Sequence, residues 1–369
     1  MKINRIIGFD AEPLFRKKDG IGAYTKELIL ASAKNHPEIT FIGLHFSDLH
    51  ITHLVNECSG VDNIEFKKIP IGRRVIRFFA EMGLWININW IINVNFDGFI
   101  YTNFVCLPWV SEKIPKSLVV HDLTYLDFPE TMNKRNYHYL KKFVPLSMNK
   151  NNVHLFTISN FMKNNIKNVF TKDAAVAYPG NSINLLSTKN SYENNFLLFV
   201  GTLEPRKNIQ RLIDSFLKLS KVERKNFRLF IVGRKGWNSN LDYDNLPKSI
   251  VFLKDVDDEK LKLLYANMYG LVFPSLYEGF GIPVLDAVIF KKPILTSEKS
   301  AMEEITTRKG AILVNPLSGE SIRNGLLKLI NLSDEQVKLM TQSSSVNIQK
   351  FNWSKTSEII LKPLLKMDK

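Results

Sequence analysis

The stretch Phe273-Pro-Ser-Leu-Tyr-Glu-Gly-Phe-Gly-Ile-Pro-Val-Leu-Asp286 decides the architecture of this chain. The apolar run 269–273 predicts a buried strand, and Pro283 followed by apolar residues is typical of a helix entry. Between them, Gly279 and Gly281 permit positive φ angles and let backbone N–H groups approach a ligand closely. The N-terminus of the helix behind this turn favours an anion. The stretch therefore predicts an anion site between a strand and a helix.

Glu278 places a carboxylate in the same turn. A carboxylate repels phosphate, so its presence suits a ligand in which a phosphate is joined to a neutral, hydroxyl-rich group such as a sugar. The alternative is an ordinary strand–turn–helix unit with a glutamate on its surface.

Glu278, seven intervening residues and Asp286 resemble the paired-acid motif of the retaining GT-B glycosyltransferases of family four. The preceding Pro-Ser-Leu-Tyr is similar to that family as well. In the family the first acid contacts the donor sugar, and the second holds the ribose hydroxyls of the nucleotide. The family normally carries Glu at both ends, so Asp286 is a departure. Its side chain is one methylene shorter but can still accept hydrogen bonds from a ribose diol.

The resemblance covers essentially the whole chain, strongly in the second half and moderately in the first. It implies an α/β architecture of the GT-B type, in which two Rossmann-like, doubly wound domains face a cleft. We expect residues 1–180 to form an N-terminal acceptor domain and residues 181–350 to form a C-terminal domain that binds the nucleotide-sugar. Residues 351–369 are expected to form a helix that packs back on the N-terminal domain. The polar run 178–195 predicts the linker.

Length and composition agree with this class. A chain of 369 residues exceeds a typical single core, and its 45% hydrophobic and 23% charged content is ordinary for a globular enzyme. Cys58 and Cys106 are too few for a disulfide framework, and no Cys/His cluster has zinc spacing. The N-terminus lacks an apolar segment of useful length, and no run of about 20 apolar residues occurs. We therefore expect a cytoplasmic protein without a signal peptide or membrane span.

The formal net charge of +14 favours anionic partners such as a nucleotide, a phospholipid surface or a nucleic acid. No helix-turn-helix, zinc or aromatic ribonucleoprotein motif is recognisable, so we expect no nucleic-acid partner. Segment 73–92 combines arginine with aromatic residues, namely Arg73, Arg74, Arg77, Phe78, Phe79, Trp85 and Trp90. A helix of this kind would lie on anionic lipid, at the inner face of a membrane. A core helix with a basic edge is the alternative, and the Ile/Asn alternation over 86–95 also permits a strand.

Two features of the first half follow predicted strands. Gly20-Ile-Gly22 comes after the strand expected over 3–9 and suits phosphate, although a plain β–α turn is the alternative. His121 ends an apolar strand, where open α/β sheets place their active sites, although a structural histidine is the alternative. The resemblance implies that Gly20 and Gly22 face the donor diphosphate and that His121 hydrogen-bonds the donor sugar. Asp122 would orient the imidazole ring.

Basic residues follow the first predicted strand of the second half, within Gly201-Thr-Leu-Glu-Pro-Arg206-Lys207. Arginine offers a planar fork and lysine a mobile point charge, so the pair can neutralise a diphosphate. A solvated basic turn is the alternative. The resembled family has an Arg/Lys pair here that grips the donor pyrophosphate. The acidic cluster 255–259 is interpreted as helix capping rather than as a metal site, and the resemblance implies that the backbone near Val256 contacts the nucleotide base.

Together these observations predict a retaining glycosyltransferase that needs neither a metal nor a cofactor. We expect it to move a hexose, first of all mannose from GDP-mannose, to a hydroxyl of a saccharide. By analogy this acceptor is lipid-linked and the process is surface polysaccharide assembly, such as that of O-antigen or lipopolysaccharide. dTDP-rhamnose or a UDP-sugar are alternative donors, and a catalytically silent nucleotide-binding scaffold is the alternative function. The expected catalytic residues are His121 and Glu278, and the expected donor-binding residues are Gly20, Gly22, Arg206, Lys207, Val256, Gly279, Phe280, Gly281 and Asp286.

Overall fold

The computed structural model describes residues 5–15, 20–46, 60–181, 195–234, 236 and 246–366. The chain divides into two compact units. The first unit contains Met1–Leu123, Lys134–Gly180 and Phe351–Lys369, and the second contains Thr124–Asn133 and Asn181–Lys350. Most of the predicted linker and Cys58 lie outside the described residues, whereas Cys106 is buried. Among the described helices, none is both long and apolar enough to cross a bilayer.

The first unit is built on a parallel sheet with the strand order β3-β2-β1-β4-β5-β6-β7. Its strands are β1 (Arg5–Asp10), β2 (Ile39–His45), β3 (Ile64–Lys68), β4 (Gly98–Tyr101), β5 (Lys116–Val120), β6 (Val153–Thr157) and β7 (Ala175–Val176). In the central register, Ile7 lies between Phe41 and Gly98. Helices cover both faces of the sheet, so the central strands are apolar along their length, as expected for a buried parallel sheet.

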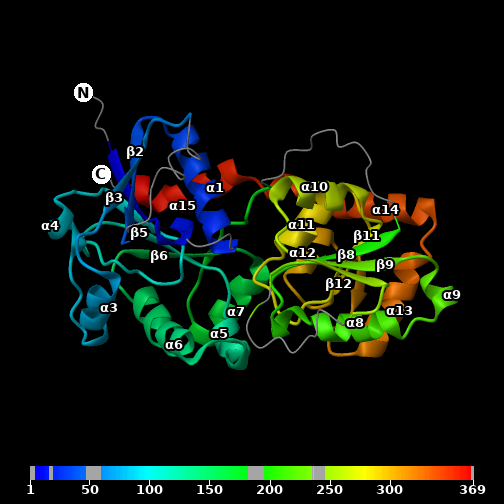
Figure 1. Ribbon diagram of the computed structural model, residues 1–369. Coiled ribbons are helices and arrows are strands. Elements are labelled where there is room, and N and C mark those ends of the chain that lie inside the picture. The colour runs from blue at the N-terminus through cyan, green and yellow to red at the C-terminus, as the bar shows by residue number, and fades with distance from the viewer. Residues whose placement is uncertain are drawn as a thin grey trace. The chain divides into compact units, whose positions relative to one another are not determined.

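The helices of the first unit are η1 (Glu12–Phe15), α1 (Gly20–Asn35), α3 (Arg73–Glu81), α4 (Ile88–Ile92), α6 (Lys134–Met148), α7 (Asn160–Phe170) and α15 (Trp353–Leu365). Figure 1 shows α1 and α15 on one face of the sheet, with α6 and α7 on the other. α15 is held to this unit by a bond from Ser117 Oγ to the carbonyl of Ile360, at 2.7 Å. A Cβ on Gly180 would stand 2.4 Å from the backbone nitrogen of Trp353, so only glycine permits this close approach.

The segment with Ile/Asn alternation is helical, and the alternative of a strand over 86–95 is wrong. The Asn87 side chain accepts a hydrogen bond from the backbone of Asn89 and caps α4, and Asn93 ends the helix with a φ of 51°. Ile88 and Ile92, one turn apart, are buried. Asparagine side chains at these positions therefore act as helix caps rather than as the polar face of a strand.

The second unit contains a second parallel sheet, with the order β10-β9-β8-β11-β12-β13. Its strands are β8 (Phe196–Val200), β9 (Arg228–Val232), β10 (Ile250–Leu253), β11 (Gly270–Phe273), β12 (Ile294–Ser297) and β13 (Ile312–Val314). β8 pairs with β9 on one side and with β11 on the other, so the strand order reverses direction between β8 and β11. Doubly wound sheets bind ligands beyond the carboxyl ends of the strands at such a point.

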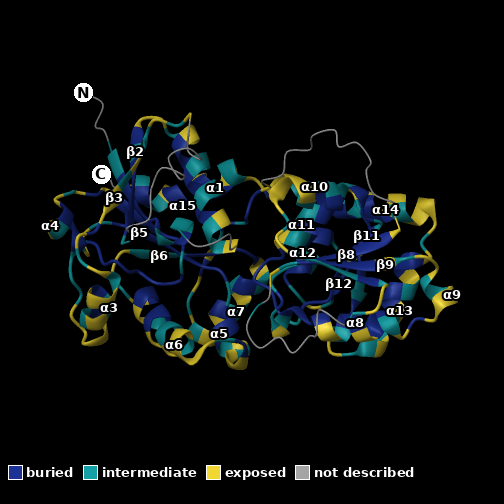
Figure 2. Ribbon diagram, viewed as in Figure 1, coloured by how far each residue is buried: buried dark blue, intermediate teal, exposed yellow. Residues whose placement is uncertain are grey.

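The helices of the second unit are α5 (Thr124–Asp127), η2 (Pro129–Thr131), η3 (Pro205–Lys207), α8 (Ile209–Leu217), α9 (Lys221–Arg224), α10 (Asp258–Asn267), α11 (Ile282–Ile289), α12 (Met302–Thr306), α13 (Gly319–Ile330), α14 (Asp334–Ser345) and η4 (Ile348–Lys350). α8 and α13 cover one face of the sheet, and α11, α12 and α14 cover the other (Figure 1). Figure 2 shows the strands buried and the exposed residues on outward helix faces. The predicted cap is confirmed, since Asp257 accepts from the backbone of Lys260.

One short segment of the first half belongs to the second unit, which no sequence pattern indicated. Thr124–Asn133 follows β5 and precedes α6, yet its contacts assign it to the second unit. The ring of Phe128 lies 5.7 Å from that of Tyr277, the residue before Glu278. This segment therefore supports the loop that carries Glu278.

Candidate functional site

Two loops of the second unit meet at the point where the strand order reverses. The loop after β8 carries Arg206 and Lys207, and the loop after β11 carries Glu278. Because β8 and β11 are parallel neighbours, both loops leave the same edge of the sheet. The backbone N–H of Leu276 donates to the carbonyl of Arg206 at 2.8 Å, which fixes one loop against the other.

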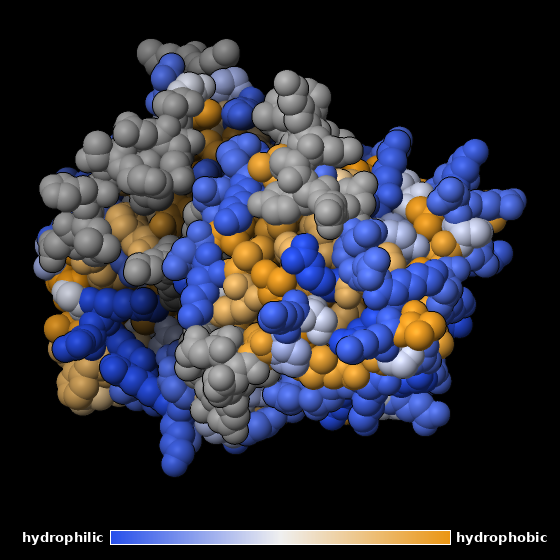
Figure 3. Space-filling model, turned by 45° about the vertical axis from the view of Figure 1, so that its right-hand side comes forward, coloured by the Kyte–Doolittle hydropathy of each residue, from blue (hydrophilic) through white to orange (hydrophobic). Residues whose placement is uncertain are grey.

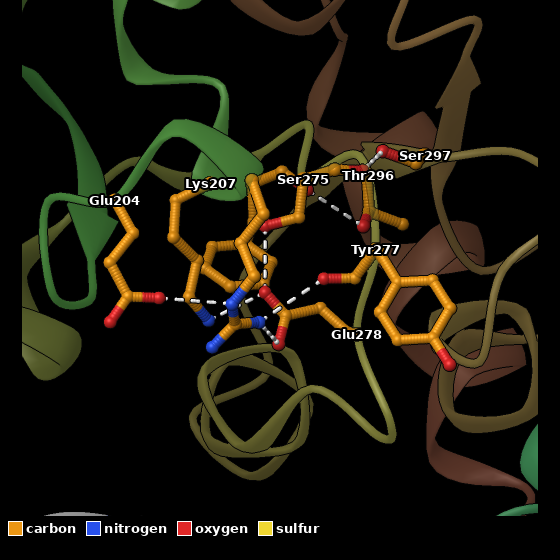
Figure 4. A network of polar contacts seen from close by, with 9 residues as sticks. Glu204, Lys207, Ser275, Tyr277, Glu278, Thr296 and Ser297 are labelled. Carbon is orange, nitrogen blue, oxygen red and sulfur yellow. Dashed lines mark hydrogen bonds and ion pairs between the residues drawn. The ribbon is translucent and has the colours of Figure 1, made fainter. Parts of the chain in front are cut away.

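Glu278 forms ion pairs with both predicted cations, as Figure 4 shows. Its Oε1 lies 2.5 Å from Lys207 Nζ, and its Oε2 lies 3.1 Å from Arg206 Nη1. Arg206 Nη1 also donates to the carbonyl of Tyr277 at 3.2 Å. Glu278 is 7% exposed and Lys207 is 8% exposed, so this carboxylate and ammonium meet with little water around them.

Two serines hold the Glu278 carboxylate in place, and sequence reasoning did not select either of them. Ser275 Oγ donates to Glu278 Oε1 at 2.8 Å, and Ser297 Oγ at the end of β12 donates to the carbonyl of Ser275 at 2.5 Å (Figure 4). Ser275 lies three residues before Glu278 inside the stretch that decides the fold, which was a usable signal. Ser297 comes from a different strand, and only the fold brings it to this loop.

Glu204 is a second carboxylate of the site that the sequence did not single out. Its Oε2 accepts from Arg206 Nε at 3.0 Å, while Glu278 binds the Nη1 side of the same guanidinium. The structure thus pairs two cations with two carboxylates, and the formal charges of these four side chains cancel. An anionic ligand that binds here must compete with Glu204 and Glu278 for the cations.

Burial and the neighbouring charges act in opposite directions on the pKa values of this cluster. Burial lowers the pKa of Lys207, and the adjacent Glu278 opposes that shift. Burial alone would raise the pKa of Glu278, but the charges of Lys207 and Arg206 outweigh it and hold the pKa of this carboxyl below its ordinary value. A charged lysine in a poorly hydrated site interacts strongly with a phosphate, because few water molecules screen it.

The glycine turn begins α11 as expected. Gly281 is the N-cap with a φ of 113°, and a Cβ there would stand 2.8 Å from Met302 Cγ. A side chain at this position would be strained both by its backbone conformation and by its neighbour. Phe280 is buried, and Gly279 precedes it in the same turn.

Asp286 lies on α11, one turn inside the helix, beside the hydroxyl of Tyr265 from α10. Burial raises the pKa of this partly exposed carboxyl from its ordinary 3.8 to about 7, and the Tyr265 hydroxyl opposes the shift. No basic side chain contributes to the pKa shift of Asp286, unlike that of Glu278. The two acids of the motif therefore have opposite electrostatic environments.

The raised pKa of Asp286 predicts a stability that depends on pH. Between pH 4 and pH 7 the folded state keeps this proton and the unfolded chain releases it, so stability falls as the pH rises. Asp286→Asn should remove this loss and raise the thermal midpoint at pH 8 by about 2–4 °C, with a smaller rise at pH 5, where only the first part of the loss has developed. Scanning fluorimetry at both pH values measures this. The exposed carboxyl of Asp214 on α8 provides a control, and Asp214→Asn should show no such difference between the two pH values.

The remaining predicted site residues lie elsewhere. Val256 is in the loop between β10 and α10 of the second unit. Gly20 and Gly22 belong to the first unit, where they form the first turn of α1 rather than a loop before it. His121 follows β5 of the first unit, and its Nε2 donates to the carbonyl of Thr102 at 2.7 Å. The ring of Tyr24 meets that of His121 edge-on at 4.8 Å, so the imidazole has a defined orientation.

The chain is similar in sequence to known glycosyltransferases. Residues 187–345 match the model of the family described as glycosyl transferases group 1. O-antigen chain mannosyltransferase B of Escherichia coli is 24% identical over 376 residues, covering 94% of this chain and 95% of that protein. O-antigen chain mannosyltransferase RfbU of Salmonella typhimurium is 28% identical over 259 residues, covering 68% of this chain and 70% of that protein.

Solved structures share the fold of this chain. WaaG, a glycosyltransferase involved in lipopolysaccharide biosynthesis, superimposes with a TM-score of 0.69 at 15% identity, covering 96% of this chain and 99% of WaaG. Anabaena Alr3699/HepE in complex with UDP and glucose has a TM-score of 0.69 at 16% identity, covering 98% of this chain and 99% of that one. The predicted fold class and resemblance are confirmed: two Rossmann-like units make up this chain, and residues 187–345 match the group 1 glycosyl transferase family.

Proposed function

We propose that this protein is a retaining glycosyltransferase that moves a hexose from a nucleotide-sugar to a hydroxyl group of a saccharide. The cluster of Arg206, Lys207 and Glu278 is the observation that carries the proposal. It combines buried cations suited to a diphosphate with a carboxylate suited to sugar hydroxyls, at the position where doubly wound sheets bind ligands. The group 1 domain and the mannosyltransferase relatives support the same reaction class.

The proposed chemistry assigns a task to each charge. Breaking the bond between the sugar and the diphosphate leaves positive charge on the sugar ring and negative charge on the departing phosphate. Lys207 and Arg206 would stabilise that negative charge, together with backbone N–H groups of the turn at Gly279–Gly281. The departing phosphate oxygen would take the proton of the acceptor hydroxyl as the new bond forms on the same face. No metal is required in this scheme, because the two cations supply the positive charge.

Glu278 would change partners when the donor binds. In the described structure its carboxylate is held by Lys207, Arg206 and Ser275. A diphosphate that attracts the two cations would weaken these bonds and leave Glu278 able to accept from a sugar hydroxyl. His121, with its orientation set by Thr102 and Tyr24, is proposed to orient the sugar as well, so both residues would act mainly by positioning.

Mannose from GDP-mannose is the donor that we favour, because relatives at 24% and 28% identity are named O-antigen mannosyltransferases. dTDP-rhamnose or a UDP-sugar remain the alternatives, and one structural neighbour is a complex with UDP and glucose. We propose a saccharide acceptor carried on a lipid, in polysaccharide biosynthesis, and a peripheral position at the inner face of the membrane.

A thermal-shift screen tests the donor site directly. The protein is heated with GDP, UDP, dTDP and their sugar derivatives, with and without EDTA. We expect a rise in the thermal midpoint with one nucleotide family, unchanged by EDTA, because a ligand that binds only the folded state stabilises it. A shift that EDTA abolishes would refute the metal-independent scheme. If no nucleotide shifted the midpoint, the donor-site assignment would fail, and hydrolysis of the donor would then separate a weak enzyme from a silent scaffold.

A further inference from the structure

α3 of the first unit has two apolar faces instead of one. Ile76 and Ala80, one turn apart, are buried against the unit. Val75, Phe78 and Met82 follow the spacing i, i+3, i+7 and lie together on another face, where Phe78 is 57% and Met82 61% exposed. Helices on the surface of a globular protein normally present polar residues to water. The outer apolar stripe of α3 therefore has no explanation within the packing of the described residues.

Two further large apolar side chains are exposed in the segment that follows the helix. Leu84 in the following turn is exposed, and Trp90 on α4 is 86% exposed. The neighbouring Trp85 is different, because its ring packs edge-on against Trp109 at 5.6 Å and Phe143 at 6.0 Å. Trp85 therefore packs against the core of the first unit. The sequence had placed it among the residues that face lipid, and the structure does not support that placement.

Basic side chains from α3 and from α6, more than fifty residues later in the chain, lie beside Phe78 of this apolar stripe. A shallow hollow is lined by Arg74, Arg77, Phe78, Glu81 and Arg135. Glu81 is neutralised by Arg77, whose Nε lies 2.7 Å from its Oε1, and Arg77 also lies 4.3 Å from the centre of the Tyr139 ring. Within the part of the chain that the structure describes, no carboxylate pairs with Arg74 or Arg135. Figure 3 shows strongly hydrophilic and apolar side chains side by side at the lower left, where α3 and α6 lie.

We propose that this surface, made of Val75, Phe78, Met82, Leu84 and Trp90 with Arg74 and Arg135, docks on an anionic lipid bilayer. The inference rests on the membrane location included in the proposed function, and it names the residues that would make the contact. α3 would lie in the plane of the interface, with its outer stripe among the upper acyl carbons. Arg74 and Arg135 would bind lipid phosphates, for which a planar guanidinium has matching donors.

The chemistry of this surface favours lipid over a protein partner. The exposed apolar residues lie along α3, in the following turn and on α4, and the hollow beside them is lined by charged side chains except for Phe78. Tryptophan and arginine are suited to the level of the headgroups, where one end of the side chain meets acyl chains and the other meets water or phosphate. The net charge of the chain, +14, provides long-range attraction to the same anionic surface.

Vesicle flotation tests the proposal with the full-length protein. We expect it to float with vesicles that contain phosphatidylglycerol and not with pure phosphatidylcholine vesicles. Arg74→Gln combined with Arg135→Gln should weaken this binding by about tenfold or more, since each basic residue near a charged bilayer adds roughly a factor of five. Phe78→Ser combined with Met82→Ser should weaken it comparably. Arg308→Gln and Val222→Ser replace residues of the second unit that are at least as exposed, and neither should alter binding.

Trp90 reports the contact at a single residue. Its emission should shift to the blue when phosphatidylglycerol vesicles are added, and Trp90→Phe should remove most of the shift.

The proposal is overturned if the parent protein does not float, if it floats equally with uncharged vesicles, or if the variants bind like the parent. Activity on a soluble acceptor tests the reaction independently of lipid binding, and the surface variants should glycosylate such an acceptor at the parental rate. If the parent protein glycosylates no acceptor, the proposed function is refuted and lipid binding stands as a separate finding.

Discussion

The Lys207→Met variant is expected to transfer sugar roughly a hundredfold to a thousandfold more slowly than the parent. Lys207 is buried, and its ammonium is proposed to stabilise the charge that develops on the departing diphosphate. Because few water molecules can replace it there, the lost interaction should affect the rate-determining chemistry rather than donor binding alone. Initial rates at saturating donor, with the donor dissociation constant measured separately, distinguish the two effects.

Two controls make this result specific. Lys218→Met removes an exposed lysine after α8 in the same unit and should leave turnover unchanged. Lys207→Met also leaves the buried Glu278 with one cation fewer, so a lower thermal midpoint is expected, and rates must be measured on protein that is shown to be folded. Parental turnover in folded Lys207→Met protein would exclude this lysine from the reaction.

Glu278→Gln is expected to separate transfer from nucleotide binding. Transfer should fall by about a hundredfold, because the amide keeps the shape of the carboxylate but is a weaker acceptor for sugar hydroxyls. The affinity for the free nucleoside diphosphate should stay equal or rise several-fold, because Glu278 no longer competes with phosphate for Lys207 and Arg206. Calorimetric titration with the nucleotide and initial-rate measurements with the sugar donor give the two quantities.

Glu204→Gln is the matched control for this experiment. The Glu204 side chain also pairs with Arg206, at 3.0 Å, but among the described residues this carboxylate forms no bond with the side chain of Lys207 or Ser275. It should share the gain in nucleotide affinity without the same loss of transfer. If Glu278→Gln and Glu204→Gln slowed transfer equally, Glu278 would be acting only through the cations and not on the sugar. A fall in nucleotide affinity on Glu278→Gln would contradict the proposed exchange of partners.

Much of the fold could be predicted from the sequence because parallel strands covered on both faces are short, continuous apolar runs. The runs that became β8 and β11 were recognised on this basis, and the proline and glycines around α11 marked its start. Segment 86–95 was ambiguous because alternation of apolar and polar residues does not separate a capped helical turn from a strand. The capping bond from Asn89 to Asn87 decides that question, and it exists only once the turn has formed.

Part of the site could be predicted because some of its residues are recognisable from the local sequence alone. Arg206, Lys207 and Glu278 carry charges that are unusual beside buried strands, so the sequence alone singles them out, and the fold brings them within ion-pair distance. Ser297 and Glu204 were missed because a serine at a strand end and a glutamate in a turn have many ordinary roles. Their importance comes from distances across neighbouring strands and loops, and no local pattern encodes those distances.

The assignment of Thr124–Asn133 to the second unit has a consequence for how this chain can be divided. A cut between residues 181 and 195 looks like a natural separation into two halves. The N-terminal piece would then carry away the Phe128 ring that packs on Tyr277, and the C-terminal piece would carry away α15, which belongs to the first unit. Each piece would lack an element that the other piece carries, because each unit includes one segment from the opposite half of the sequence. A cut at this point would therefore leave each unit without a segment that belongs to it.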